Sequence, residues 1–406
     1  MTIHSRRAFL GKMGAVSLTA PFLGACHQSQ SSQNNTDNSS KSTKNCLADH
    51  TFEFYGEHQA GITTPSQRHI YFLVADLHTT DLETIKTVFK NWTAYSEKLT
   101  QGQNIQAYGD NAHVPPIDTG EADSLSAYGL TLTFGVSRSF LEKLGLHNKI
   151  PADFSELPSF PRDQIKPNLS GGDICIQACS DDAQVAFHAV RQLVRQARNA
   201  ITMKWSQSGF TSYDTADETP RNLFGFKDGT ANTATLKEPN KHLWVDSGWL
   251  KNGTYLVARV IQMHLETWDR TSLNGQNETF GRIRNSGAAM GQLHEFDPVD
   301  VTKKDENGNV VMPAISHTAL ANRSGLQILR RSYSYSSGIV PNTGQFDAGL
   351  LFISFQKTPM QFVGIQTALG RVDKMNEYIT HIGSGLFACF GGIKKGEYLG
   401  QALFEN

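Results

Sequence analysis

Strand-like and helix-like segments alternate in the same order in both halves of this chain. In the first half, strand patterns at residues 70–77 and 173–179 each lead into a segment with helical apolar spacing. In the second half, strand patterns at residues 255–260 and 350–355 repeat this order. Residues 130–135 alternate like a half-buried strand. The repeated order predicts an α+β fold.

Capping patterns mark the start of two helices. Asp181 and Gln184 have capping-box spacing just after the strand pattern of the first half. In the second half, Thr358 can be the N-cap, Pro359 the first helical residue and Gln361 the reciprocal cap. The sequence therefore predicts that helices begin at these two turns.

The N-terminus carries the pair Arg6-Arg7, followed by a modestly apolar run at residues 13–25. This run is shorter than the ~20 apolar residues that a membrane span needs, so residues 1–26 are interpreted as a twin-arginine export signal. Twin-arginine signals address a route for folded proteins, which suits an enzyme whose cofactor is inserted in the cytoplasm. The signal predicts a periplasmic or cell-envelope location.

The apolar run ends in Leu23-Gly24-Ala25-Cys26, which resembles the lipobox of a bacterial lipoprotein. Lipidation of Cys26 would give the chain a lipid anchor on a membrane face. The alternative is an incidental cysteine near an ordinary cleavage site. Residues 27–50 are mostly polar and are interpreted as a flexible spacer, which suits a tether.

Charge and cysteine content exclude some classes of function. The formal net charge of −1 gives no electrostatic reason to expect a nucleic-acid partner. The five cysteines do not form a disulfide framework. Cys175 and Cys179 lie on one predicted strand, roughly 13 Å apart, too far for a disulfide. They are therefore predicted to be core residues on one face, rather than zinc ligands.

The remaining length suits two medium-sized domains. The polar stretch at residues 211–220 has little to bury, so it marks the expected boundary. We predict an N-terminal domain at residues 51–215 and a C-terminal domain at residues 216–406.

The segment Gly225-Phe226-Lys227-Asp228-Gly229-Thr230 places a carboxylate between glycines, in a region rich in aromatic and apolar residues. Glycines allow the backbone to approach a flat ligand closely. Taken alone, Lys-Asp-Gly is also an ordinary surface turn. Two later features add weight to a functional interpretation: His317 in Ser-His-Thr, and Arg330 in Leu-Arg-Arg-Ser-Tyr.

Asp228, His317 and Arg330, in this order, resemble the dye-decolorising (DyP-type) haem peroxidase family, which carries a G-x-x-D-G loop, a haem-ligating histidine and an arginine closely downstream. Three segments are similar to its EfeB-like deferrochelatase/peroxidase branch: residues 55–62, 265–273 and 349–356. The resemblance runs from about Phe52 to the C-terminus. It implies duplicated ferredoxin-like domains, each an antiparallel sheet with packed helices, with haem b in the C-terminal half.

The resemblance also implies roles for single residues. His317 is expected to be the axial ligand of the haem iron. Asp228 is expected to be catalytic, accepting a proton from peroxide and returning it to the leaving oxygen. Arg330 is expected to lie against the haem and supply a fixed positive charge during O–O cleavage. Gly229 is the expected point of close approach to the cofactor.

Two positions depart from the family pattern. Ala319 stands where many members have an arginine that pairs with a haem propionate, so Arg270, Arg323 or Arg331 would have to compensate. Ser332 stands where the EfeB-like branch has glycine and some other branches have asparagine. Two further histidines, His188 and His381, are interpreted as structural.

The resemblance implies an exported peroxidase that reduces hydrogen peroxide while oxidising bulky aromatic donors, porphyrinogens or ferrous iron. It also implies a link to ferrous-iron uptake components, removal of iron from haem as a second activity, and assembly as a homo-oligomer. The alternatives are a non-catalytic haem carrier or sensor, which needs His317 alone, and a ferredoxin-like binding module without haem. Asp228 and Arg330 favour the enzyme, because a carrier needs no acid–base group.

Overall fold

In the first half of the chain, the expected strand and helix pattern forms a βαββαβ unit. The computed structural model describes residues 48–107, 109, 111–215 and 218–405, so the predictions on Arg6-Arg7, Cys26 and most of the spacer lie outside the described residues. Strand β3 lies between β1 and β2, and β4 lies on the other side of β1, all antiparallel. The elements are β1 (His69–Leu77), α1 (Leu82–Leu99), β2 (Thr131–Val136), β3 (Ile174–Ser180), α3 (Ala183–Ala197) and β4 (Ile201–Phe210).

The second half repeats this unit with a long insertion after its first strand. Strand β5 lies between β9 and β8, and β7 pairs with the other edge of β8, again antiparallel. Both halves therefore have the strand order of a ferredoxin-like unit, as predicted. Its main elements are β5 (Thr254–Met263), β7 (Tyr333–Ile339), β8 (Phe346–Gln356), α9 (Pro359–Gly370) and β9 (Ile379–Cys389).

Shorter elements fill the connections. The insertion after β5 contains α6 (Leu265–Trp268), α7 (Leu273–Phe280), α8 (His317–Arg323) and the two-residue strand β6 (Leu329–Arg330), which pairs with β8. The others are α2 (Arg138–Lys143), η1 (His147–Lys149), η2 (Pro167–Leu169), α4 (Asn232–Lys237), α5 (Pro239–His242), η3 (Gly248–Leu250), η4 (Lys374–Glu377) and α10 (Gln401–Glu405).

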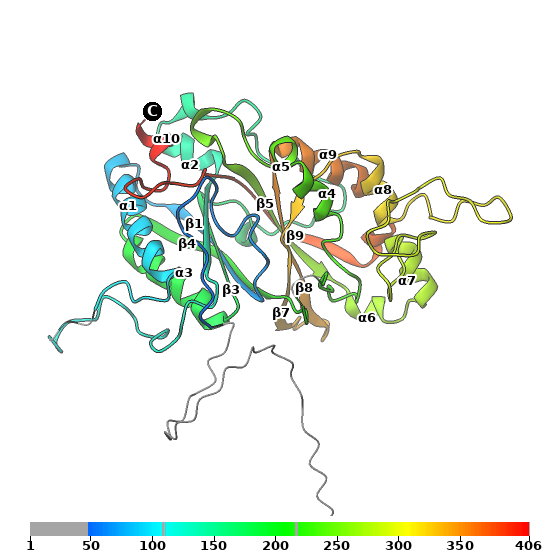
Figure 1. Ribbon diagram of the computed structural model, residues 1–406, viewed down its shortest axis with the longest axis horizontal. Coiled ribbons are helices and arrows are strands. Elements are labelled where there is room, and N and C mark those ends of the chain that lie inside the picture. Colours follow the sequence, from blue (N-terminus) through cyan, green and yellow to red (C-terminus); the bar gives the residue numbers. More distant parts are fainter. Residues whose placement is uncertain (1–47, 108, 110, 216–217, 406) are drawn as a thin grey trace, which may run out of the picture. The chain divides into compact units, whose positions relative to one another are not determined.

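The two half-sheets are joined at both of their outer edges. Gly135 and Val136 of β2 pair with Cys389 and Ala388 of β9 at one edge, and β4 pairs with β7 at the other. The inner faces of the half-sheets pack on each other through apolar side chains such as Phe72, Val74, Leu256, Leu351 and Phe387. Helices α1 and α3 cover the outer face of the first half, and α8 and α9 lie on the side of the second (Figure 1).

Because strands of the two half-sheets pair at both edges, the described residues form one compact unit. The limits predicted for two domains stay a prediction.

Strand β2 differs from the expected half-buried strand, because all six of its residues are buried. One face packs in the core beneath the helices. Gln59 and Gly61 cover the other: the Gln59 amide donates to Phe134 O and Phe390 O at 2.9 Å and accepts from Phe134 N at 2.8 Å. Gly61 has φ of +88°, and a Cβ there would lie 2.5 Å from Thr133 Oγ1. The segment at residues 55–62 therefore seals the seam between the half-sheets.

The two predicted helix starts have different outcomes. Thr358, Pro359 and Gln361 form the expected capping box of α9. The N-cap of α3, however, is Asp182 rather than Asp181, because Asp182 accepts from Gln184 N and Val185 N. Asp181 instead accepts from Arg68 N at 3.0 Å and ties the turn to β1.

Cysteines in the described part of the chain are core residues, as predicted for Cys175 and Cys179. Both are fully buried between the half-sheets, together with Cys389, and all three are free thiols. Burial raises the pKa of the Cys175 thiol well above its usual value, and the neighbouring Cys389 raises it further. A thiol that resists ionisation in this way is a poor metal ligand.

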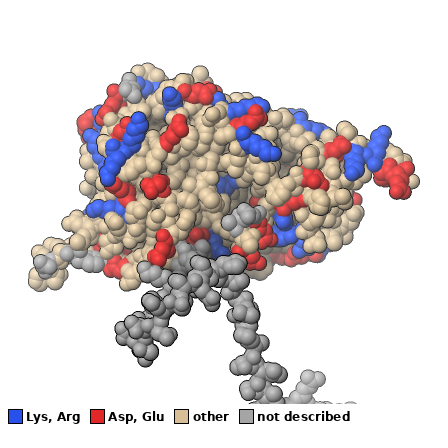
Figure 2. Space-filling model, viewed as in Figure 1, with Lys and Arg blue, Asp and Glu red and all other residues tan. Residues whose placement is uncertain are grey.

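The surface mixes both signs of charge. Lys and Arg are interspersed with Asp and Glu over the face shown in Figure 2, which agrees with a formal net charge of −1. Within the described ranges, no helix is both long and apolar enough to cross a lipid bilayer.

Candidate active site

A cavity of about 540 Å³ lies on the outer face of the second half-sheet. Arg259, Ile261 and Met263 reach it from β5, because alternate residues of a strand share one face. Helices α8 and α9 and the segment at residues 222–235, which runs into α4, form further walls. Its size falls within the range of small-molecule and cofactor pockets. The apolar lining residues include Phe280, Leu350, Phe352, Phe362, Ile365 and Leu369.

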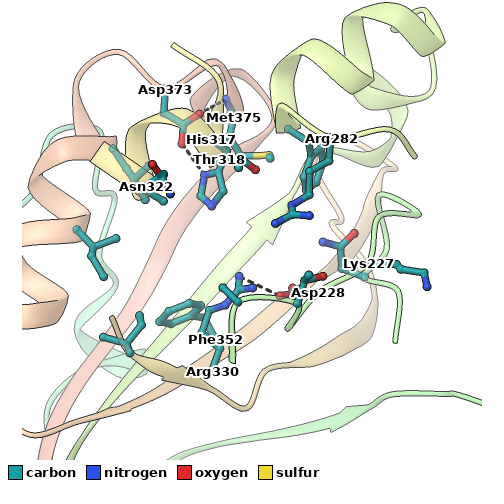
Figure 3. A pocket seen from close by; sticks show the side chains of 18 of the residues that line it. Lys227, Asp228, Arg282, His317, Thr318, Asn322, Arg330, Phe352, Asp373 and Met375 are labelled. Atoms are coloured by element: carbon teal, nitrogen blue, oxygen red, sulfur yellow. Dashed lines mark hydrogen bonds and ion pairs between the residues drawn. The ribbon is translucent and has the colours of Figure 1, made fainter. Parts of the chain in front are cut away.

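His317 lines one side of this cavity as the first residue of α8 (Figure 3). Ser316 caps the helix, since its side chain accepts from Ala319 N. The Nδ1 atom of His317 lies 2.7 Å from Oδ2 of Asp373. Because a carboxylate only accepts, this bond places a proton on Nδ1, and in the neutral ring the lone pair is then on Nε2. The ring is thus oriented so that Nε2 is the atom available to a ligand.

Asp373 is itself fixed before it meets the histidine. It is the N-cap of η4, where its Oδ1 accepts from Met375 N at 2.9 Å. Its side chain is only 3% exposed. A buried carboxylate on the second nitrogen of a ligating histidine orients the ring and raises its basicity. No short pattern in the sequence identifies this carboxylate.

Asp228 and Arg330 lie together across the cavity from His317 (Figure 3). Arg330 Nη1 is 3.0 Å from Asp228 Oδ1, and the two side chains are 26% and 15% exposed. Gly225 has φ of +81°, and a Cβ there would lie 2.9 Å from Arg284 Nε, so this position requires glycine. Gly229 also has positive φ, at +123°. Its neighbours Asp228 and Thr230 line the cavity, but Gly229 itself does not.

One carboxylate holds the loop on both sides of Asp228. Glu295 Oε2 accepts from Lys227 Nζ at 2.5 Å, and its Oε1 accepts from Thr230 Oγ1 at 2.9 Å. Burial alone would raise the pKa of Glu295, but hydrogen bonds from Lys227, Thr219 and Thr230 lower it overall. Glu295 therefore stays ionised and fixes the loop. No sequence motif marks this residue.

The basic residues expected to replace the missing propionate partner lie elsewhere. Arg270 is exposed and donates to Glu266 O at 2.9 Å, and Arg323 donates to Ala314 O at 2.7 Å. Arg331 is buried on the inner side of the sheet, where it binds Thr64 O at 2.6 Å and the Gln67 side chain. None of the three lines the cavity.

Arg282 is a cation of the site that no sequence pattern marks. It lines the cavity and donates to Gly287 O at 2.7 Å. Burial lowers the pKa of its guanidinium, and the nearby Arg330 lowers it further. From the wall of the cavity, Arg282 can donate hydrogen bonds to an anionic group on the molecule that fills it.

A second missed group is the cluster of Arg259, Asp163 and His381. Arg259 is 1% exposed, pairs with Asp163 Oδ1 at 2.5 Å, and leaves its buried Nε without a partner. His381 lines the same cavity, and its interpretation as a structural residue stays a prediction. Burial lowers its pKa to about 3, and Arg259 and His317 contribute to the shift.

His188 is buried on α3, away from the cavity, beside Gln192.

Sequence models described as "Dyp-type peroxidase, N-terminal" and "Dyp-type peroxidase, C-terminal" match residues 59–211 and 219–394. The chain belongs to the Dyp-type peroxidase family. It is 36% identical over 372 residues to a deferrochelatase of Yersinia pseudotuberculosis, covering 87% of this chain and 84% of the relative. A deferrochelatase of Escherichia coli O157:H7 is 34% identical over 421 residues, covering 99% of this chain and 97% of the relative.

Solved structures of this family share the fold. A DyP-type peroxidase from Streptomyces coelicolor superposes with a TM-score of 0.82 at 34% identity, covering 89% of this chain and 98% of that chain. One from Cellulomonas bogoriensis gives a TM-score of 0.80 at 34% identity, covering 89% and 99%. This Dyp-type peroxidase is therefore a haem-dependent oxidoreductase that uses hydrogen peroxide and an electron donor.

The residues of the cavity fit haem b. Neutral imidazole is the axial ligand that peroxidases use, and His317 presents its free nitrogen to an apolar cavity. The guanidinium of Arg282, which lines the cavity, and the free Nε of Arg259 suit the two propionates of the cofactor. Both the ligand and the counter-charges are thus present in this chain.

Replacing Asp373 with Asn should weaken His317 as a ligand, because Nδ1 loses its charged acceptor. We expect haem affinity or peroxide turnover to fall about 10–100-fold, measured by haem titration at the Soret band and by steady-state kinetics. Asp269→Asn, an exposed change outside the cavity, is the matched control. A D373N protein with unchanged affinity and turnover would contradict the role given to Asp373.

Proposed function

We propose that this protein is an exported haem peroxidase that oxidises bulky aromatic donors, porphyrinogens or ferrous iron, and that it serves iron or haem-iron acquisition. The observation that carries its chemistry is the Asp228–Arg330 pair facing His317 across one cavity. A carrier or sensor needs only the histidine and the apolar walls. A carboxylate and a guanidinium held together on the open side add acid–base function.

Each of the two groups has a separate task in the proposal. Asp228 accepts a proton from one oxygen of hydrogen peroxide and delivers it to the oxygen that leaves as water. Arg330 stabilises the negative charge that develops as the O–O bond breaks, and it does not lose its own charge near neutral pH. Haem held by His317 would supply the redox chemistry of this cleavage, with the electrons coming in the end from the donor. Glu295 keeps the Asp228 loop in place throughout.

Asp228→Asn tests the enzyme against the carrier. The change keeps the size of the side chain but removes its proton-accepting function, so the rate of reaction with peroxide should fall by roughly 10²–10⁴-fold. Haem content should stay the same, because the ligand is His317. Stopped-flow absorption at the Soret band measures the rate, with Asp269→Asn as the control. Unaltered kinetics would favour the carrier.

The relatives in Yersinia and Escherichia coli are named deferrochelatases. We extend the proposal to a second activity, in which two protons replace iron on the porphyrin nitrogens and free iron and intact protoporphyrin are released. Anaerobic incubation of the protein with haem, followed by chromatography, should then yield metal-free protoporphyrin. Recovery of haem alone, from a preparation that still reacts with peroxide, would remove this activity and leave the peroxidase.

The proposed location rests on the N-terminal sequence. Arg6-Arg7 and the short apolar run favour export by the twin-arginine route, and Cys26 favours a membrane tether. Mass spectrometry of the mature protein should show a chain that begins at a lipidated Cys26. An unlipidated chain that begins beyond residue 26 would rule out the anchor and keep the export. Assembly as a homo-oligomer and contact with ferrous-iron uptake components stay predictions.

A further inference from the structure

Arg330 lies on a strand that offers little support of its own. Strand β6 has only two residues, Leu329 and Arg330, and it pairs with β8 along one edge. The next residue, Arg331, donates its N–H to Ile353 O of β8 at 2.9 Å. Because successive N–H groups of a strand point to opposite edges, the N–H and C=O of Arg330 point away from β8. No other described strand pairs with this edge.

The side chain of Asn232 occupies the place of the missing strand. Its Oδ1 accepts from Arg330 N at 2.9 Å, and its Nδ2 donates to Arg330 O at 2.7 Å. A primary amide presents a donor and an acceptor in one plane, so it can satisfy both backbone groups of one residue. Thr235, on the next turn of α4, adds a bond from its Oγ1 to Ile328 O at 3.0 Å. Helix α4 is therefore fastened to the strand that carries Arg330.

Asn232 also belongs to the loop that carries Asp228. It lies four positions after Asp228 and donates its backbone N–H to Gly229 O at 2.8 Å. Arg330 is thus held to the same loop at two points: its guanidinium binds the Asp228 carboxylate at 3.0 Å, and its peptide groups bind the Asn232 amide. The first contact can break while peroxide reacts, because Asp228 changes its protonation. The second does not involve a titrating group.

We propose that Asn232 is a positioning residue that holds the backbone of Arg330, and hence its guanidinium, at a fixed place opposite His317. This inference rests on the proposed role of Arg330 in peroxide cleavage. The clamp keeps the guanidinium aligned when the bond from Asp228 is lost. Its removal leaves the peptide groups of Arg330 unpaired and frees β6 to shift.

Asn232→Asp is the sharpest test, because it keeps the shape and the acceptor but loses the donor to Arg330 O. The second carboxylate oxygen of Asp also lies near Arg330 O, where the Asn232 Nδ2 donor was, so the two oxygens repel each other. A displacement of about 1 Å in a catalytic group can cost roughly 10²-fold in rate, so we expect kcat/KM for hydrogen peroxide to fall by roughly that factor. Haem content and the Soret spectrum should not change. Asn240→Asp, an exposed asparagine on α5, is the matched control.

A double-mutant cycle with Arg330→Leu separates positioning from general damage. If Asn232 acts through Arg330, N232D should lower the rate strongly in the native protein and by less than about twofold in the R330L background. Asn232→Ala, which removes both bonds without adding charge, provides a second cycle if N232D is not recovered with haem.

Each outcome of the cycle decides one question. A native rate in N232D and N232A, with a slow R330L protein, would overturn the positioning role and leave the proposed function intact. An equal loss in both backgrounds would also overturn it, since Asn232 would then act independently of Arg330. A native rate in R330L itself would instead overturn the proposed role of Arg330.

Discussion

The ion pair between Arg330 and Asp228 is the interaction on which the rest of the site depends. It brings together a loop that follows the first half-sheet and a two-residue strand late in the second half. Neither segment is held by long regular structure. Glu295 fixes the loop on both sides of Asp228, and Asn232 fixes the strand through its peptide groups. Side-chain bonds thus replace the backbone pairing that sheets and helices normally provide.

The opposite side of the cavity is built in another way. His317 begins a capped helix, and its ring is oriented by Asp373, which is buried and bound to Met375 N. Here a single chain of contacts fixes one atom, Nε2, toward the cavity. One side of the cavity is therefore suited to hold a ligand firmly, whereas the other side carries an ion pair between a carboxylate and a guanidinium.

The local sequence predicted much of this structure because the signals are local. The strand at residues 255–260 and the capping box at Thr358 depend on short patterns. The three residues singled out by the family resemblance, Asp228, His317 and Arg330, line one cavity, and their roles stay predictions. Asp373, Arg282 and Glu295 could not be found in this way. Asp373 lies 56 positions from His317, and Glu295 lies 68 positions from Lys227, so only the fold brings them together. Sequence patterns also cannot tell which of two adjacent aspartates caps a helix. Asp182 caps α3, whereas Asp181 accepts from Arg68 N, and only the fold decides which backbone N–H groups each carboxylate can reach.

Because the half-sheets pair at two edges, part of the sheet can form only late in synthesis. Strand β2 from the first half cannot complete its pairing until β9, near the end of the chain, has left the ribosome. Until then the N-terminal unit presents an open edge, which other chains can join. The ring of strands therefore closes only after almost the entire polypeptide has been made.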